Sequence, residues 1–184
     1  QFMEQMDGAA VMKIVSPDIL HKTDAKGVLL NIETPEAAKD AFDALKNNAL
    51  NYNPNADIFG IMLSPMIPMG VECIIGSTWD TTFGPTVMFG LGGIFVEVLK
   101  DVAFRVAPVN LPEASAMIKE IKGAGILDGV RGAKGVDKDA LAQAICRLSY
   151  MVAELSDIAE VDMNPVFAMQ EGLAVVDARI VLHP

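Results

Sequence analysis

Short apolar runs recur along the chain, and most of them end at a proline or a glycine. Residues 10–15 (AVMKIV) end at Ser16-Pro17, and residues 28–32 (VLLNI) follow Gly27. Runs of this length and composition are typical of buried strands. The same pattern predicts further strands at 57–64, 71–77, 85–89, 94–99, 158–166 and 173–182. The last two are separated by AMQEG, which indicates a hairpin.

Apolar residues at helical spacing predict three helices. The first begins after Thr34, which suits the N-cap, with Pro35 at the first helical position, and it ends near the asparagines that precede residue 57. The other two span residues 112–121 and 137–154. In the last helix the apolar residues recur every three or four positions, so we expect this helix to pack on a sheet.

Strands and helices are mixed along the chain, which predicts an α+β fold. The stretch SPMIPMG at 64–70 contains two prolines and a glycine, and prolines cannot continue a central strand. We therefore expect a hinge there, between a first lobe at 1–66 and a second lobe at 67–184. Each lobe is expected to be an antiparallel-rich sheet covered by helices.

Composition narrows the class of protein. The formal net charge is −10, which argues against a nucleic-acid binder, because such proteins neutralise phosphates with lysine and arginine. No apolar run reaches the roughly 20 residues that a membrane helix needs. Cys73 and Cys146 lack metal-ligand spacing, so we expect buried, reduced thiols in a cytoplasmic protein.

Two residues near the start of the chain are candidates for chemistry. Lys13 lies inside an apolar strand; it either binds an anion such as a phosphate or reaches water from an edge strand. His21 lies in the polar loop SPDILHKTDAKG. It could be a general base, a metal ligand, a nucleophile that accepts a phosphoryl group, or a loop residue without a role.

Two further clusters lie in the second half. The glycines of GLGG at 90–93 allow close backbone approach, although a simple turn explains them equally well. Asp162 and Asn164 alternate on one strand, and Asp177 on the partner strand could meet them. These hard oxygen ligands suit Mg²⁺, but they could equally be solvent-facing polar residues. Together, a cation, a hinge, a glycine loop and an acidic face are the parts of an ATP site between two lobes.

Three stretches carry a family resemblance: KIVSPDILHKTDAKGV, GVECIIGSTWDTTFGPTVMFGLGGIFVEVLKDVAFRVAPV and EVDMNPV. They resemble the ATP-grasp domain of the NDP-forming acyl-CoA synthetases, which include the ADP-forming acetate–CoA ligases and are related to the β subunit of succinyl-CoA synthetase. The resemblance runs from about residue 10 to the end. It implies an ATP-grasp fold and a ligase that interconverts acyl-CoA, ADP and phosphate with acid, CoA and ATP through phosphohistidine.

The resemblance also implies site residues, cofactors and partners. His21 matches a histidine that relays the phosphoryl group, Lys13 a nucleotide-phosphate lysine, and Glu72 an acidic residue near the ribose. The remaining matches are Ser64, Pro65 and Met66 in the adenine hinge, Asp162, Asn164 and Asp177 on the magnesium face, and Arg105 and Arg179 as weaker phosphate candidates. The cofactors implied are ATP or ADP and Mg²⁺. A CoA-binding domain or subunit is the expected partner, in an oligomer without nucleic acid or membrane.

The sequence departs from the family pattern at two places. The residues before Ala10 lack the helices and strands that normally open an ATP-grasp domain, so we expect an incomplete first lobe. Ala25-Lys26 stand where the family more often has valine or isoleucine followed by glycine, which affects the geometry of the histidine loop.

Two other functions remain open at this stage. One is a regulatory module that does not turn over, fused to a lysine acetyltransferase; the other is an ATP-grasp ligase that uses an acyl-phosphate without a histidine relay.

Overall fold

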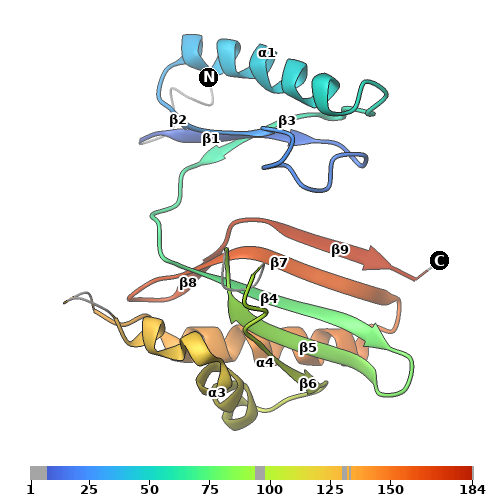
Figure 1. Cartoon of the computed structure of the whole chain (residues 1–184), viewed down its shortest axis with the longest axis vertical. Coiled ribbons are helices and arrows are strands. Elements are labelled where there is room, and N and C mark those ends of the chain that lie inside the picture. The colour runs from blue at the N-terminus through green and yellow to red at the C-terminus, as the bar shows by residue number, and fades with distance from the viewer. Residues whose placement is uncertain (1–7, 94–97, 130–131, 133, 184) are drawn as a thin grey trace. The chain divides into compact units, whose positions relative to one another are not determined.

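Two antiparallel sheets organise the chain, one in each of two units (Figure 1). The computed structural model describes residues 8–93, 98–129, 132 and 134–183. The units are Gln1–Pro68 and Met69–Pro184. The division lies within the proline- and glycine-rich stretch at 64–70.

Among its described residues, unit 1 is a three-stranded sheet with one helix. Its strands are β1 (Ala10–Val15), β2 (Val28–Ile32) and β3 (Gly60–Pro65), in the order β2-β1-β3. Helix α1 (Pro35–Tyr52) begins at Thr34, whose side chain accepts a hydrogen bond of 3.1 Å from the backbone N–H of Ala37. This cap satisfies one of the helix's unpaired N–H groups.

Alternation along β1 sorts its side chains between two faces. Ala10, Met12 and Ile14 are buried and belong to the apolar clusters that α1 completes. The helix contributes Ala41, Leu45 and Ala49. Because successive side chains on a strand point to opposite faces, Lys13 projects from the face of β1 that α1 does not cover.

Unit 2 is a six-stranded sheet with helices on one face (Figure 1). The strand order is β6-β5-β4-β7-β8, and β9 also pairs with β7. The strands are β4 (Val71–Asp80), β5 (Gly84–Leu91), β6 (Val102–Val106), β7 (Ile158–Ala168), β8 (Leu173–Val175) and β9 (Ala178–Leu182). The helices are α3 (Leu111–Glu120) and α4 (Lys138–Glu154), with a 3₁₀ segment, η2 (Lys122–Asp128), between them.

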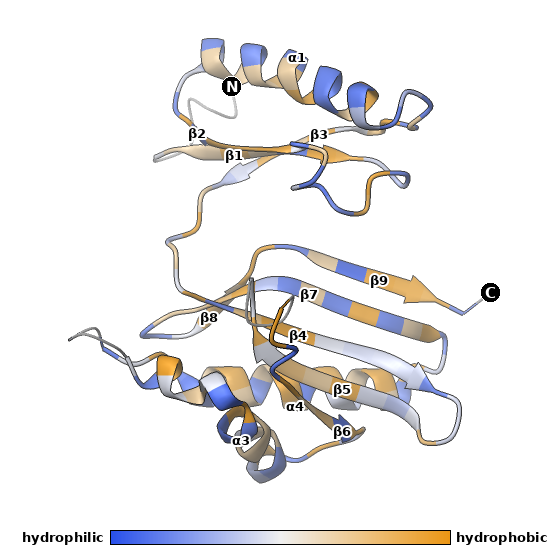
Figure 2. Ribbon diagram, viewed as in Figure 1, coloured by the Kyte–Doolittle hydropathy of each residue, from blue (hydrophilic) through white to orange (hydrophobic). Residues whose placement is uncertain are grey.

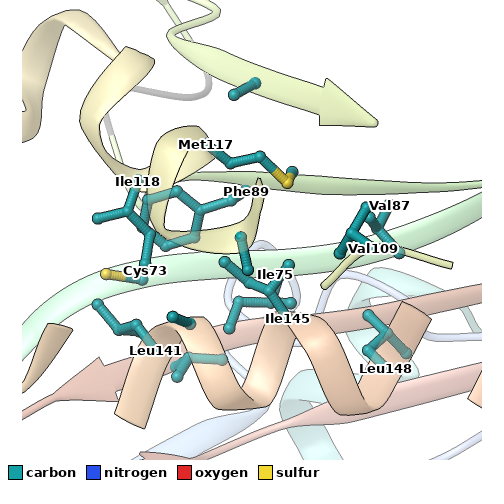
Figure 3. Close-up of a cluster of buried hydrophobic side chains, with 14 of the residues drawn as sticks. Cys73, Ile75, Val87, Phe89, Val109, Met117, Ile118, Leu141, Ile145 and Leu148 are labelled. Carbon is teal, nitrogen blue, oxygen red and sulfur yellow. The ribbon is translucent and has the colours of Figure 1, made fainter. Parts of the chain in front are cut away.

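The core of unit 2 lies between the sheet and the two helices (Figure 3). Phe89 of β5 is fully buried and lies among side chains from both helices. Those neighbours in the cluster include Met117, Ile118, Leu141 and Ile145. Burial of each such side chain stabilises the fold by about 1.5–3 kcal/mol. Because Leu141 and Ile145 of α4 share this cluster with Phe89 of β5, the predicted packing of the last helix on a sheet is confirmed.

Several elements differ from those that the sequence predicts. The third strand begins at Gly60 rather than residue 57, and the predicted closing strand at 173–182 is divided into β8 and β9 around Val176-Asp177. The prediction of a strand at 94–99 falls largely outside the described residues, because 94–97 are not described; Val98 and Leu99 lie in a turn. The strand of that region is β6.

The 3₁₀ segment η2 is held by a buried carboxylate. Asp101 is 7% exposed and accepts hydrogen bonds of 2.7 Å from the backbone N–H groups of Lys122 and Gly123. A carboxylate with two such donors is stable when buried. Asp101 therefore has a structural task, which its position among other charged residues in the sequence does not reveal.

Both cysteines are free thiols, as the sequence predicts, but only Cys73 is buried; Cys146 is partly exposed, so the prediction of burial is wrong for it. Cys73 is buried, and this burial, together with the nearby Glu72 carboxylate, raises the pKa of the thiol to about 12. None of the helices among the described residues combines the length and apolar character that a bilayer crossing requires.

Gly70, just before β4, leaves no room for a side chain. A Cβ atom there would lie 2.4 Å from the carbonyl oxygen of Ala168. We expect Gly70→Ala to lower the free energy of unfolding by about 1–3 kcal/mol, because the backbone itself must shift. Gly125, around which a Cβ would meet nothing within 4 Å, gives the control variant Gly125→Ala. Urea unfolding measures both; equal stability of the two variants would contradict the close approach.

Asp137 joins the start of α4 to the turn between β7 and β8. Its carboxylate accepts 2.9 Å hydrogen bonds from the backbone N–H groups of Ala140 and Gly172. These donors hold the pKa of Asp137 below its ordinary value of 3.8, with Ala140 the larger cause. The stabilisation is therefore present above that value and is lost as the pH falls through the lowered pKa of the folded state.

Replacing this carboxylate tests the link between α4 and the turn. Asp137→Asn keeps an oxygen for Ala140 but turns an NH₂ group toward the N–H of Gly172. We expect a Tm at pH 7 lower by about 2–4 °C, with the difference from wild type shrinking below pH 4. Glu171→Gln, an exposed change in the same turn, is the control. A pH-independent difference in Tm would show that the charge of Asp137 has no part in it.

Candidate functional site

His21 lies exposed on a loop whose other side is buried. The loop spans residues 16–27, between β1 and β2. Ile19 and Ala25 are 1% and 3% exposed and pack with Ile14 and Ala49. In the sequence, His21 therefore lies between two residues whose buried side chains attach the loop to the apolar cluster.

Hydrogen bonds close the second half of this loop into turns. Gly27 donates to the carbonyl of Lys22 at 2.7 Å, and Lys26 donates to the carbonyl of Thr23 at 3.0 Å. The carbonyl of Gly27 then accepts from the N–H of Ile14 at 2.8 Å. A Cβ on Gly27 would lie 2.6 Å from the side chain of Ile14, so the loop returns to β1 only with glycine at this position.

Lys13 lies on the central strand of unit 1 and is 6% exposed. The alternative of a lysine on an edge strand that reaches water therefore does not apply. Its neighbours across the sheet are Val28 on β2 and Met62 on β3. An ammonium group among such residues is costly unless an anion or polar atoms face it.

The predicted adenine hinge follows the outer edge of unit 1. Among the described strands β3 pairs only with β1. The N–H of Met66 donates to the carbonyl of Ala9 at 3.0 Å, so the backbone groups of Met66 and, two residues earlier, Ser64 point toward β1. Of the three hinge residues, Pro65 is the one whose carbonyl points to the open side.

Glu72 and the glycine loop lie together in unit 2. The N–H of Gly92 donates to the carbonyl of Glu72 at 2.8 Å, and a Cβ on Gly92 would lie 3.0 Å from the Cβ of Glu72. Gly93 has a φ of 58°, which favours glycine. A Cβ there would lie 3.5 Å from Oε2 of Glu72. The two glycines therefore allow the backbone of the loop to lie close to the exposed side chain of Glu72.

Asp162, Asn164 and Asp177 lie beside one another in unit 2. Asn164 donates its backbone N–H to the carbonyl of Asp177 at 3.1 Å, and Val176 donates to Pro165 at 3.0 Å. These two bonds join β7 to the segment between β8 and β9. The alternation of hydrophilic and hydrophobic residues along β7 is visible in Figure 2. Val161 and Met163 belong to the core, so Asp162 faces away from the helices.

An irregularity in β7 sets the position of Asn164. Cys73 pairs with Val166 and Ile75 with Met163, so Asn164 and Pro165 together oppose a single residue of β4. Such bulges re-aim side chains and are common next to active sites. The bulge therefore begins at Asn164, the residue that alternation along the strand puts on the same face as Asp162.

The donor set of this face suits a hard divalent cation. Two carboxylates and one amide oxygen are ligands that Mg²⁺ accepts, together with waters and phosphate oxygens. Among the described residues no group of three or more His, Cys, Asp and Glu side chains could hold a metal ion by itself. Three protein oxygens leave coordination positions that water or phosphate oxygens could fill.

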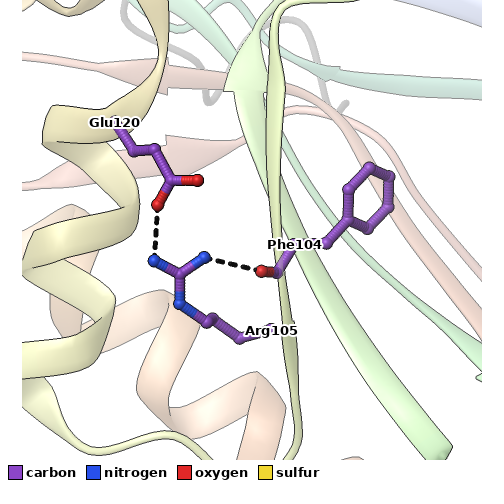
Figure 4. Close-up of polar contacts among 3 residues, drawn as sticks. All are labelled: Phe104, Arg105 and Glu120. Atoms are coloured by element: carbon purple, nitrogen blue, oxygen red, sulfur yellow. Dashed lines mark hydrogen bonds and ion pairs between the residues drawn. The ribbon is translucent and has the colours of Figure 1, made fainter.

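Arg105 and Arg179, the weaker phosphate candidates, both have carboxylate partners. Arg105 lies 2.5 Å from Oε2 of Glu120 on α3 and donates to the carbonyl of Phe104 (Figure 4). This guanidinium holds the pKa of Glu120 below its usual range. Arg179 on β9 forms an ion pair with Glu160 on β7. Neither contact is with the residues predicted to bind Mg²⁺.

Two residues that support the histidine loop escape sequence analysis. The carboxylate of Asp18 accepts a 2.7 Å hydrogen bond from the N–H of Asp57. The side-chain NH₂ of Asn48, on α1, donates to the carbonyl of Lys26 at 3.0 Å. The Pro17-Asp18 pair signals a turn, but no local signal connects Asn48 with a loop 22 residues earlier.

Comparison with known proteins gives one family. A family model described as "ATP-grasp domain" matches residues 1–182. The β subunit of ADP-forming acetate–CoA ligase I from Pyrococcus furiosus is 50% identical over 182 residues, which cover 99% of this chain and 78% of that relative.

Solved structures agree with this match. Acetyl-coenzyme A synthetase 1 of Ca. Korarchaeum cryptofilum, in complex with coenzyme A, Ca-AMPCP and HgCl⁺, is 46% identical with a TM-score of 0.95, over 99% of this chain and 80% of that chain. The same synthetase with coenzyme A and Mg-AMPPCP is 42% identical with a TM-score of 0.84 and the same coverage. In that structure the phosphohistidine segment points towards the nucleotide binding site. The chain thus belongs to the ATP-grasp family and, within it, to the β subunits of the ADP-forming acetate–CoA ligases.

Proposed function

We propose that this chain is the nucleotide-binding part of an acyl-CoA synthetase that converts acyl-CoA, ADP and phosphate into acid, CoA and ATP. In this proposal the two units are the two lobes of the ATP-grasp fold, and a separate CoA-binding domain or subunit is the partner. That partner binds the acyl group and CoA and carries the first phosphohistidine. The presence of CoA and Mg-AMPPCP in the solved relative supports this division of tasks.

His21 is the phosphoryl carrier of this chain. One imidazole nitrogen of His21 forms a bond to phosphorus while the bond from phosphorus to the partner's histidine nitrogen breaks. A terminal phosphate oxygen of ADP then forms a bond to the same phosphorus, and the bond to His21 breaks, which leaves ATP and a free imidazole. Covalent relay divides one difficult transfer into two steps.

Other predicted site residues in each unit bind and orient the phosphates. The Lys13 ammonium attracts the phosphate oxygens, and the Pro65 carbonyl at the open side of β3 can accept a hydrogen bond from the amino group of adenine. Glu72 is placed to accept from a ribose hydroxyl. Asp162, Asn164 and Asp177 would hold Mg²⁺, which when bound neutralises the charge of the phosphates.

The observation that carries the proposal is the presentation of His21. Its side chain is exposed although residues on either side of it, Ile19 and Ala25, are buried. The buried residues fix the backbone on either side of His21, while the imidazole itself stays accessible to a reaction partner. A nucleophile must reach its substrate from a defined position.

Labelling with ATP tests this role. The complete enzyme is incubated with γ-labelled ATP and Mg²⁺, and acid-labile, base-stable phosphate on this chain is measured. We expect label on the wild type and none on His21→Ala. His183→Ala is the matched control, because the chain has two histidines and His183 instead packs edge-on against Trp79. Equal labelling of all three proteins would contradict the relay.

A further inference from the structure

The proposed carrier residue raises the question of what moves during transfer. A phosphoryl group must leave one partner and reach another, so either the loop that bears His21 swings or its partners come to it. The contacts of the loop decide between these possibilities. This inference rests on the proposed function of His21 and concerns how that residue is held.

Two kinds of contact, apolar packing and hydrogen bonds, fix the loop to the body of unit 1. Ile19 and Ala25 are buried at either side of His21, in a cluster with Ile14 and Ala49. Swinging the loop would expose both side chains to water. Removing one isoleucine from its cluster alone costs on the order of 1.5–3 kcal/mol.

Hydrogen bonds hold both ends of the same loop. At the first end, Asp18 accepts from the N–H of Asp57 at 2.7 Å. At the second end, the side-chain NH₂ of Asn48 donates to the carbonyl of Lys26 at 3.0 Å. Lys26 adopts a φ of 48°, a left-handed conformation that a residue with a side chain adopts only at some cost. The Asn48 contact holds the peptide that leaves this conformation.

We infer that the histidine loop is a fixed platform, and that Asn48 is a positioning residue that holds His21 in place through Lys26. Side-chain rotation, not backbone motion, then redirects the imidazole, and the phosphoryl donor and acceptor move to it. The hydrogen bond from Asn48 stabilises the left-handed peptide here, where no glycine relieves it.

Kinetics of an Asn48 variant test the positioning role. In the complete enzyme, Asn48→Ala should lower the single-turnover rate of His21 phosphorylation by about 10- to 100-fold, because small misplacements of a nucleophile are costly. The KM for nucleotide should change by less than about twofold, since Lys13 and the metal ligands are untouched. Asn47→Ala, at the exposed neighbouring position of α1, should retain the wild-type rate.

The outcomes separate this inference from the proposed function. A lower Tm with an unchanged rate per folded molecule, or a normal rate in Asn48→Ala, would overturn the positioning role while leaving the relay intact. Absence of phosphate on His21 in the wild type would instead overturn the relay itself.

Hydrogen exchange tests the platform directly. The N–H of Gly27 donates to Lys22 within the loop, and the N–H of Asp57 donates to Asp18 of the loop. Both N–H groups should keep the same protection from exchange with and without nucleotide and partner. Loss of that protection during turnover would show that the loop swings.

Discussion

Asp162→Asn and Asp177→Asn are each expected to lower the rate of phosphoryl transfer in the complete enzyme by about 100- to 1,000-fold, the usual effect of removing one group that stabilises transition-state charge. Each change replaces a carboxylate by an amide of the same shape on the face proposed to hold Mg²⁺. The fold should be retained, because neither side chain belongs to the apolar core. Steady-state kinetics at several Mg²⁺ concentrations measure the effect.

The dependence on Mg²⁺ distinguishes a metal ligand from a general electrostatic role. For both variants the Mg²⁺ concentration that gives half-maximal rate should rise, and high Mg²⁺ should restore part of the activity. Asp157→Asn, an exposed change just before β7, should leave both quantities unchanged. Rates within threefold of wild type for Asp162→Asn and Asp177→Asn would show that the face does not bind the catalytic metal.

Lys13→Met is expected to raise the KM for nucleotide by about 100-fold, which corresponds to about 2.7 kcal/mol of lost binding. The physical reason is the loss of the cation proposed to attract the phosphates, at a poorly hydrated strand position that is 6% exposed. The free energy of unfolding is measured as well, because removing one charged group from a buried strand position also changes stability.

The comparison of binding and stability makes this test specific. Nucleotide binding by calorimetry and unfolding by urea are measured on the same preparations. Lys39→Met, on α1 at an exposed position, is the control for loss of one positive charge from the chain. If Lys13→Met unfolds more easily but binds nucleotide normally, Lys13 stabilises the sheet rather than the ligand.

The elements that sequence reasoning predicts well are those with a strong local pattern. The start of α1 follows from Thr34 and Pro35, and the packing of α4 follows from its apolar spacing. The boundary between β8 and β9 could not be predicted, because Val176 continues the apolar run of residues 173–175, and it is the hydrogen bonds from Asn164 and to Pro165 that set Val176-Asp177 apart. The bulge in β7 likewise depends on a register that spans about 90 residues.

The candidate site shows the same division. His21 and Lys13 stand out because their types conflict with their surroundings in the sequence. Asn48 and Asp101 act through hydrogen bonds to backbone groups 22 and about 21 residues away, and no local pattern marks such partners. Predicting them requires the tertiary contacts that bring α1 to the histidine loop and η2 to the start of β6.

The central claim is that the phosphoryl group passes through His21 at a rate that supports turnover. A rapid-quench experiment mixes the enzyme, already phosphorylated on the histidine of its CoA-binding part, with ADP and Mg²⁺. Phosphate on this chain should rise before ATP appears and fall as ATP forms, with both rates at least equal to kcat. ATP formation without transient label on His21, at an undiminished rate, would contradict the relay.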